Sequence, residues 1–167
     1  AGGHFPISLY QRFYTKKEFY SYFKFSFVRN PWDRVLSAYI FLQNGGFTAE
    51  DRSWGFRYIN AETDFRQFVK KSLSDPVVLS WIHFRPQIEH LRGDEGIVNV
   101  DFIGYVENLQ EDFQYVAMKL GLKHSNVKAC NVSRIKSQDY RKYYDNESRE
   151  LIRLIYEEDI DYFKYSF

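Results

Sequence analysis

Apolar residues are spaced with two different periods in the first quarter of the chain. Over residues 22–28, aromatic residues alternate with polar ones at Phe23, Phe25 and Phe27, which predicts a β-strand. Over residues 31–43, apolar residues instead recur at every third or fourth position, which predicts a helix with one apolar face. That face consists of Trp32, Val35, Leu36, Tyr39 and Ile40. A strand that runs directly into a helix is the building unit of α/β proteins.

Weaker patterns of the same two kinds fill most of the remaining chain. A second strand is expected over residues 97–104. A long loop is expected over residues 44–62, because this stretch is rich in glycine and has no periodic pattern of apolar residues. Loops of this length often carry function. The expected helices cover residues 8–21 as one helix or a pair of helical turns, 64–73 with Asp75-Pro76 ending it, part of 77–92, 108–120, and 146–163 with Asn146 as N-cap. Alternating strands and helices predict an α/β layer fold, with residues 1–167 in a single domain.

Composition limits the classes of function. Aromatic residues make up 20% of the chain, which is enough for a packed core, and a net charge of +1 gives no overall field to attract nucleic acid or an anionic membrane. No apolar run approaches the ~20 residues of a membrane-spanning helix. The single cysteine, Cys130, cannot form an internal disulfide, which suits a reducing compartment, and no Cys/His spacing predicts a zinc site.

The junction between the first strand and its helix is the best candidate for a binding site. Asn30 suits the N-cap of the helix, Pro31 suits its first position and Asp33 suits its first turn. Arg29 therefore stands at the carboxyl end of the strand, where ligands bind in open α/β sheets. Arg29 offers a two-pronged donor, the helix N-terminus offers N–H groups, and Ser37, off the apolar face, offers a hydroxyl, which together suit a phosphate. The alternative is a surface ion pair between Arg29 and Asp33.

The same segment resembles a known motif. Residues 29–39, RNPWDRVLSAY, resemble the 3'-phosphate-binding motif of the carbohydrate sulfotransferases, which reads roughly R-[ND]-P-x-[DE]-R-x-x-S-x-Y. HFRPQ at 83–87 is similar to the H-W-x-P-Q segment of chondroitin-type members, and VDFIGYVENLQEDF at 100–113 is similar to their YDFIG-x-x-E-x-L-x-x-D stretch. Residues 140–165 resemble the C-terminal helix of bacterial members. The resemblance covers almost the whole chain, with its parts in the expected order.

This resemblance implies a fold and an activity. The implied fold is α/β, of the three-layer P-loop NTPase-like type around a mainly parallel sheet. The implied enzyme transfers a sulfuryl group from 3'-phosphoadenosine 5'-phosphosulfate to a hydroxyl of a carbohydrate or other acceptor, without a metal ion and without a nucleic-acid partner. The expected location is the cytoplasm, or the Golgi lumen for an animal protein.

The resemblance also assigns residues to the donor. Matched position by position, Arg29 and Ser37 would hold the 3'-phosphate. Residues 131–134 resemble the N-x-S stretch before the last helix of bacterial members, so Arg134 is a further candidate for a phosphate contact. The alternative for Arg134 is a solvated basic loop.

The catalytic base is assigned to His4. Sulfuryl transfer is helped by a positioned group that removes the proton of the acceptor hydroxyl, and histidine suits that task. The stretch Gly3-His4-Phe5 is similar to the Gly-His-Val segment of uronyl 2-O-sulfotransferases, where the histidine is the proposed base. His83 is a second candidate, and the alternative for it is a packed histidine bonded to main chain.

The chain departs from the family in one respect. The family has a first strand followed by a loop such as P-K-x-x-G-T-[ST], which wraps the 5'-phosphosulfate with backbone N–H groups and a lysine. No such stretch occurs in the sequence, so about forty residues, one βα unit and a connector, are expected to be missing. We therefore expect the chain as given to be weakly active or inactive, and its unpaired strand edges to favour self-association.

Three other functions match parts of the sequence. A degenerate relative that binds a nucleotide or a glycan without chemistry would explain the missing loop. A nucleotide kinase shares the type of fold but needs a Walker lysine and a metal-binding aspartate that no motif supplies. A single-stranded nucleic-acid binder would use the runs of aromatic and basic residues, although core packing explains the aromatics better. The expected loop also holds four side chains suited to contact a sugar: Trp54, Phe56, Arg57 and Tyr58.

Overall fold

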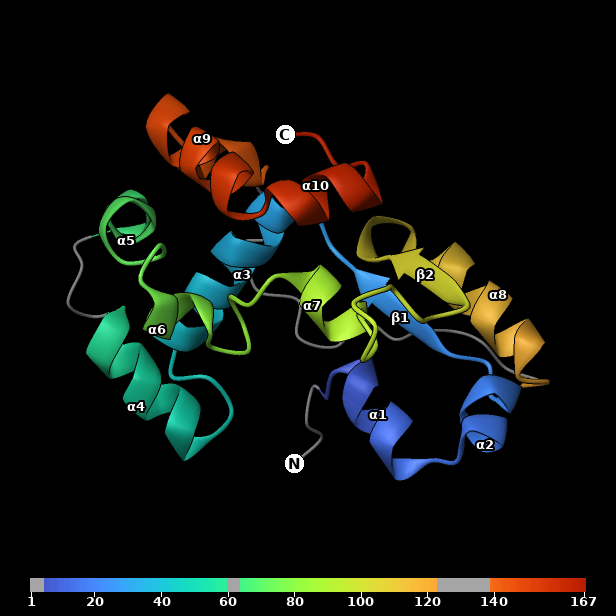
Figure 1. Cartoon of the computed structure of the whole chain (residues 1–167). Coiled ribbons are helices and arrows are strands. Elements are labelled where there is room, and N and C mark those ends of the chain that lie inside the picture. Colours follow the sequence, from blue (N-terminus) through green and yellow to red (C-terminus); the bar gives the residue numbers. More distant parts are fainter. Residues whose placement is uncertain (1–4, 60–63, 123–138) are drawn as a thin grey trace. The chain divides into compact units, whose positions relative to one another are not determined.

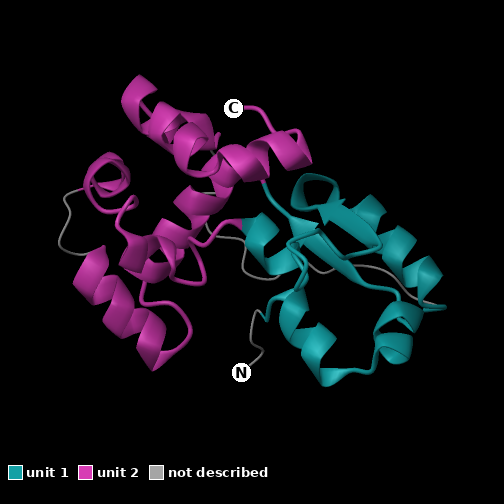
Figure 2. Cartoon of the chain, in the orientation of Figure 1, with its two compact units in different colours: residues 1–29, 87–131 teal, residues 30–86, 132–167 magenta. Residues whose placement is uncertain are grey.

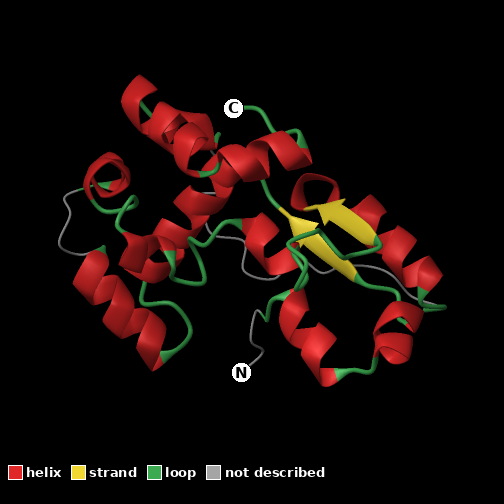
Figure 3. Ribbon diagram, in the orientation of Figure 1, coloured by secondary structure: helices red, strands yellow, loops and turns green. Residues whose placement is uncertain are grey.

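The structure is a computed structural model that describes residues 5–59, 64–122 and 139–167 of the chain. These residues form helices and a small parallel sheet, so the predicted α/β class is confirmed (Figures 1 and 3).

The chain divides into two compact units (Figure 2). Residues 1–29 and 87–131 make unit 1, and residues 30–86 and 132–167 make unit 2. Unit 1 is therefore discontinuous in sequence, because more than fifty residues of unit 2 separate its two parts. The expectation of a single domain stays a prediction, and the two units are described separately.

Unit 1 contains two parallel strands, β1 (Phe25–Val28) and β2 (Phe102–Tyr105), paired from Phe25 opposite Phe102 to Val28 opposite Tyr105. The pairing starts beside an ion pair, in which the Lys24 ammonium lies 2.8 Å from Oδ2 of Asp101. The main-chain N–H of Lys24 donates to the same oxygen at 2.7 Å. The described helices of this unit are α1 (Ile7–Phe13), α2 (Lys16–Ser21), α7 (Gln87–Leu91) and α8 (Leu109–Lys119), with the 3-10 turn η1 (Val106–Asn108) before α8.

Unit 2 is organised around helix α3 (Pro31–Gln43). Every residue of its predicted apolar face is buried, and it packs against the helices at both ends of the unit's sequence. Phe68, Phe84 and Ile152 are fully buried partners in the same core. The other described helices of the unit are α4 (Ala49–Tyr58), α5 (Phe65–Lys71), α6 (Pro76–Leu79), α9 (Asn146–Ile155) and α10 (Glu157–Phe163), with the 3-10 turn η3 (Tyr140–Tyr143) before α9.

The prediction of a long loop over residues 44–62 is wrong, because helix α4 lies within that range. Its N-cap is Thr48, whose Oγ1 accepts the N–H of Asp51 at 3.0 Å, while Oδ2 of Asp51 accepts the N–H of Thr48 at 3.1 Å. This reciprocal cap satisfies main-chain N–H groups that a short helix otherwise leaves exposed. Gly55, which suggested a loop, is instead the point where α4 meets α3: a Cβ added there would lie 2.4 Å from the main-chain oxygen of Leu42.

Other boundaries differ by smaller amounts. Both strands are shorter than the ranges predicted for them. Helix α5 ends at Lys71, before Asp75-Pro76, and these two residues begin a helix rather than end one. Oδ1 of Asp75 accepts the N–H of Val77 at 2.8 Å, so Asp75 is the N-cap of α6 and Pro76 is its first residue. Proline suits the first helical position because an N–H group there has no acceptor within the helix, so the lack of one costs no hydrogen bond.

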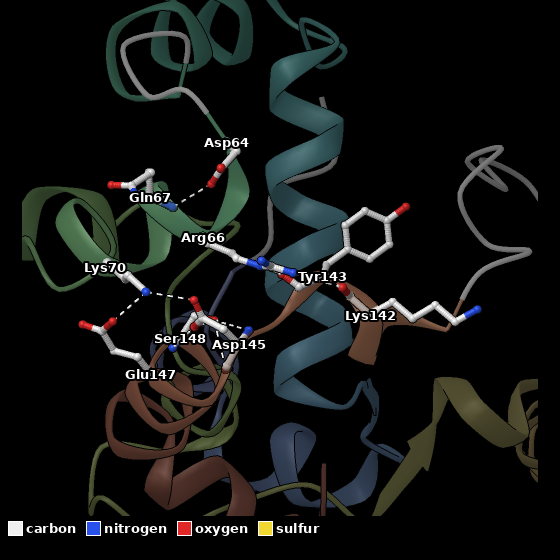
Figure 4. Close-up of polar contacts among 9 residues, drawn as sticks. All are labelled: Asp64, Arg66, Gln67, Lys70, Lys142, Tyr143, Asp145, Glu147 and Ser148. Carbon is white, nitrogen blue, oxygen red and sulfur yellow. Dashed lines mark hydrogen bonds and ion pairs between the residues drawn. The ribbon is translucent and has the colours of Figure 1, made fainter.

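The predicted last helix is divided at Tyr156 into α9 and α10, and its N-cap is Asp145 rather than Asn146. Oδ1 of Asp145 accepts the N–H of Ser148 at 2.8 Å, and the Ser148 hydroxyl accepts the N–H of Asp145 at 3.0 Å. The other carboxylate oxygen, Oδ2, lies 2.8 Å from the ammonium of Lys70 on α5, which also lies 2.6 Å from Glu147 (Figure 4). Asp145 thus caps α9 and joins it to α5 at the same time.

We predict that Gly55→Ala destabilises the chain. Replacing glycine by alanine inside a helix normally stabilises the helix by about 1 kcal/mol. Here the added methyl group would overlap the main chain of α3, and such overpacking destabilises a protein by about 1–3 kcal/mol. Urea unfolding followed by circular dichroism would measure the difference. Ser53→Ala, on the exposed side of the same helix, should be close to neutral, and equal effects of the two changes would contradict this packing.

We also predict that Asp145→Asn weakens the chain near neutral pH and less so in acid. Hydrogen bonds from Lys70 and Ser148 hold the pKa of Asp145 well below its usual range. Because its pKa is lower in the folded chain, the ionised carboxylate stabilises the fold fully above about pH 4, and this contribution is lost as the pH falls further.

The measurement is the free energy of unfolding of wild type and variant at a series of pH values. Asparagine also serves as an N-cap, so the variant loses only the negative charge beside Lys70 and the helix start, which costs about 0.3–1 kcal/mol, and the difference should shrink below about pH 4. Glu147→Gln, which removes the other partner of Lys70 but leaves Asp145 ionised, should cost less at neutral pH. A difference that is independent of pH would contradict the assignment.

Candidate functional site

The end of β1 is fixed by a two-way hydrogen bond from a glutamine. The main-chain N–H of Arg29 donates to Oε1 of Gln87 at 2.9 Å, and Nε2 of Gln87 donates to the main-chain oxygen of Arg29 at 2.9 Å. A primary amide has one acceptor and donors in one plane, so it can bond the main chain as a neighbouring strand does. Gln87 is the last residue of the HFRPQ segment. That segment therefore holds the main chain of Arg29, whose side chain is half-buried.

In unit 2, the start of α3 confirms the predicted cap. Oδ1 of Asn30 accepts the N–H of Trp32 at 3.1 Å, and the main-chain oxygen of Asn30 accepts the N–H of Arg34 at 2.8 Å. Nδ2 of Asn30 donates to the main-chain oxygen of Ser166 at 2.8 Å. Two N–H groups of the helix start are therefore bonded to Asn30, and Pro31 has none. The role of this helix end as a phosphate site stays a prediction.

The same helix end is bonded to the C-terminal part of the chain. The Trp32 indole N–H donates to the main-chain oxygen of Arg149 at 3.0 Å, and the Tyr144 hydroxyl donates to the main-chain oxygen of Trp32 at 2.8 Å. Burial raises the pKa of Tyr144 well above its usual value, so the hydroxyl keeps the proton that it donates. These bonds hold α3 against η3 and α9 and so fix the direction of its polar side chains.

Ser37 lies on the more polar side of α3. It is half-buried, and among the residues that the structure describes its hydroxyl has no hydrogen-bond partner. Arg34, Ser37 and Phe41 are spaced by three and four positions, so they share one side of the helix. None of the three is fully buried, in contrast to the apolar face of the same helix.

His83 is paired with a carboxylate from α4. Nε2 of His83 lies 3.2 Å from Oδ1 of Asp51, and the His83 ring meets Phe41 edge-on with 5.1 Å between ring centroids. Oδ2 of Asp51 accepts main-chain N–H groups from Phe47 and Thr48 at 3.2 and 3.1 Å. Burial works to raise the pKa of Asp51, but the hydrogen bonds from Thr48, His83 and Phe47 outweigh it and hold the pKa below its usual value.

The predicted site residues have different outcomes. Arg29 ends β1 in unit 1, and Ser37 lies on α3 in unit 2, each as its element predicted. His4 and Arg134 lie outside the described residues, so their roles stay predictions. The packed alternative for His83 is partly right, since its ring packs on Phe41, and one ring nitrogen also lies within hydrogen-bonding distance of the Asp51 side chain.

Two functional candidates were missed by sequence reasoning, Gln87 and Asp51. The Thr48-x-x-Asp51 spacing is a capping signal that could have located the start of α4. The pairing of Asp51 with His83 joins positions 32 residues apart, which no local pattern reports. The prediction that Trp54 contacts a sugar is wrong, because this side chain is 7% exposed and stacks on Trp81 with 5.2 Å between ring centroids.

Comparisons with known proteins give one family and one relative. The model of a family described as "Sulfotransferase family" matches residues 7–166 of the chain. An uncharacterised protein of Archaeoglobus fulgidus is 36% identical over 107 residues, which cover 64% of this chain and 74% of that protein. No solved structure matches the chain. In the described parts of the chain, no helix combines the length and apolarity needed to cross a membrane.

We predict that Gln87→Leu loosens the end of β1. The change leaves the N–H and the oxygen of Arg29 without their amide partner, and such a loss costs about 1–3 kcal/mol when the groups are shielded from water. Amide hydrogen exchange should become faster at Arg29 and along β1. Gln114→Leu, on the exposed side of α8, serves as the control. Unchanged exchange at Arg29 in Gln87→Leu would contradict the role of this side chain.

Proposed function

Because the chain belongs to the sulfotransferase family, we propose that it transfers a sulfuryl group from 3'-phosphoadenosine 5'-phosphosulfate to a hydroxyl group of a carbohydrate. The observation that carries the proposal is the Arg29–Tyr39 segment, in which an arginine ends a strand and a serine lies off the apolar face of the next helix. The family match covers this segment together with most of the chain.

Arg29 and Ser37 are the proposed ligands of the donor's 3'-phosphate. A guanidinium gives a phosphate two parallel N–H donors, and a serine hydroxyl adds a third. Gln87 holds the main chain of Arg29, so less freedom is lost when the side chain binds an anion. The half-buried Ser37 hydroxyl has no hydrogen-bond partner among the described residues, so a bond to a ligand would replace none that these residues make. Arg134 is a further proposed contact.

The proposed reaction is an in-line displacement at sulfur. The acceptor oxygen forms a bond to sulfur while the bond between sulfur and the bridging phosphate oxygen breaks, and adenosine 3',5'-bisphosphate leaves with that electron pair. The proton of the acceptor hydroxyl passes to a base, for which His4 is the candidate. A base in contact with the hydroxyl contributes typically about 10²–10⁴-fold to such a step.

We further propose that β1 and β2 belong to a mainly parallel sheet in the three-layer, P-loop NTPase-like arrangement. The two strands are parallel neighbours, although Lys24 and Asp101 at their starts are 77 residues apart in sequence. Parallel neighbours with helices in their connection are the recurring unit of such folds.

A second candidate function is a non-catalytic relative that binds the nucleotide or a glycan. The two candidates share the 3'-phosphate site and differ in turnover, so transfer of label from the donor to a carbohydrate separates them.

We predict that the chain binds adenosine 3',5'-bisphosphate more tightly than adenosine 5'-monophosphate, and that Arg29→Ala removes most of the difference. A charged hydrogen bond contributes about 1.5–3 kcal/mol, which corresponds to a loss of roughly 10–100-fold in affinity. Ser37→Ala should lose less, because a single hydroxyl bond to an anion is weaker than a bidentate one. Isothermal titration calorimetry measures both ligands.

The control is Arg12→Ala, which removes an exposed arginine of the same unit from its ion pair with Asp94 and should leave binding unchanged. Arg29→Lys keeps the charge but loses the pair of parallel N–H donors of the guanidinium. Its affinity for the bisphosphate should therefore lie between those of wild type and Arg29→Ala. Equal affinity of the wild type for the two nucleotides would overturn the proposal.

A further inference from the structure

Residues 165–167, here called the C-terminal segment, follow α10 and contact the start of α3. Nδ2 of Asn30 donates to the main-chain oxygen of Ser166 at 2.8 Å. The ring of Phe167 meets the Trp32 indole edge-on, with 5.5 Å between the ring centroids. Asn30 and Trp32 both belong to the RNPWDRVLSAY stretch. The C-terminal segment therefore contacts the proposed phosphate-binding motif directly.

The end of α10 sets the direction of this segment. Lys164, the C-cap of the helix, is in the left-handed conformation with φ at 59°. The N–H of the next residue, Tyr165, donates to the main-chain oxygen of Ile160 at 3.0 Å. A left-handed residue with such a bond is a common way for a helix to end, because it satisfies carbonyl groups of the last turn. The change of direction before the segment is thus fixed by local hydrogen bonds.

The ring of Phe167 is held by side chains from η3 and α9 and from the residue between them. The rings of Tyr140 and Tyr144 meet it edge-on, with centroid distances of 5.8 and 5.7 Å. The guanidinium carbons of Arg141 and Arg149 lie 5.9 and 5.4 Å from its centroid. Edge-to-face ring pairs and cations over a ring are both attractive contacts. Phe167 is therefore the anchor that keeps the C-terminal segment in place.

The bond to Ser166 fixes the side chain that caps α3. Oδ1 of Asn30 accepts the N–H of Trp32 at 3.1 Å, while Nδ2 is the donor to Ser166. Because a primary amide is planar, the bond at its nitrogen holds its oxygen in the position that caps the helix. Asn30 is only 7% exposed, so losing this partner would leave a poorly hydrated donor. The C-terminal segment thus stabilises the capped form of the turn that follows Arg29.

We propose that the C-terminal segment is a positioning element of the 3'-phosphate site, with Phe167 as its essential side chain. Arg29 directly precedes the turn at Asn30, and Ser37 follows it on α3. When this turn has one conformation, less freedom is lost as the two side chains bind one phosphate. Phe167 acts through Asn30 and Trp32 and does not touch the ligand. The inference rests on the proposed function, because it takes Arg29 and Ser37 as phosphate ligands.

The coupling between the segment and the site works in both directions. If docking of the segment strengthens binding of the bisphosphate by some factor, the bound bisphosphate must stabilise the docked segment by the same factor. The affinity of a variant that releases the segment and the response of the segment to ligand are therefore two measurements of one quantity.

The first test compares the wild type with Phe167→Ala. Adenosine 3',5'-bisphosphate and adenosine 5'-monophosphate are titrated into each by calorimetry. Phe167→Ala should weaken binding of the bisphosphate roughly 2–10-fold and leave that of the monophosphate unchanged, since only the bisphosphate has the 3'-phosphate. Phe167→Tyr, which keeps the ring, should restore the affinity. Tyr162→Ala, which removes an aromatic side chain of α10 that is 49% exposed, is the matched control.

A second variant tests the path through Asn30. Asn30→Ser keeps a residue that caps helices well but removes the amide donor to Ser166. It should weaken bisphosphate binding, and in the Phe167→Ala background it should add little, because both changes release the same segment. Additive losses in the double variant would overturn the proposed path. Melting temperatures without ligand show whether each variant is folded.

A measurement on the unmodified chain keeps the proposal testable if these variants do not fold. Hydrogen exchange at the N–H of Tyr165, which is bonded to Ile160, reports release of the segment. Saturation with the bisphosphate should slow this exchange roughly 2–10-fold, and saturation with the monophosphate should not. Unchanged exchange with the bisphosphate bound would overturn the inference.

The two proposals fail in different ways. A wild type that does not distinguish the two nucleotides overturns the proposed function and the role of the segment with it. A wild type that distinguishes them, together with a folded Phe167→Ala variant of equal affinity, overturns only the role of the segment. A variant that loses affinity for both nucleotides by the same factor would likewise overturn that role, because its effect would not concern the 3'-phosphate.

Discussion

The burial of α3 is the constraint on which unit 2 depends. Water is excluded from most of the helix surface, so the polar groups at its start must find partners within the protein. Asn30 supplies several of these bonds, and Tyr144 supplies another. The side of the helix with Arg34, Ser37 and Phe41 is not fully buried. The same packing that stabilises the unit therefore restricts where a ligand can meet this helix.

In each unit, one polar side chain fixes the main chain or side chain of a candidate site residue. Gln87 bonds both main-chain groups of Arg29, and Asp51 bonds the turn before α4 as well as the ring of His83. Asp51 uses one carboxylate oxygen for the turn and the other for His83, whereas Gln87 uses both its amide oxygen and its amide nitrogen for Arg29. Groups held in this way lose little conformational freedom when a ligand arrives.

Some elements of this structure could be predicted from the sequence and others could not, for reasons that differ from element to element. The change of period between Phe27 and Trp32 was sufficient to predict β1 and α3, because alternation and a helical face are local signals. Helix α4 was missed because glycines suggested a loop, whereas Gly55 serves close packing against α3. The burial of Trp54 depends on Trp81, and the orientation of His83 depends on Asp51. Contacts between distant positions of this kind are set by tertiary packing, which no window of sequence contains.

The discontinuous sequence of unit 1 has a consequence for how the chain reaches its native state. β1 leaves the ribosome well before its partner β2, because the whole of residues 30–86 is synthesised between the two parts of the unit. Pairing of strands across such a separation is intrinsically slow, because closing the long intervening loop loses conformational entropy before any strand contact forms. During translation the nascent chain therefore exposes the backbone edge of β1, with Phe25 and Phe27 on it, at the stage when a chaperone would be of most use.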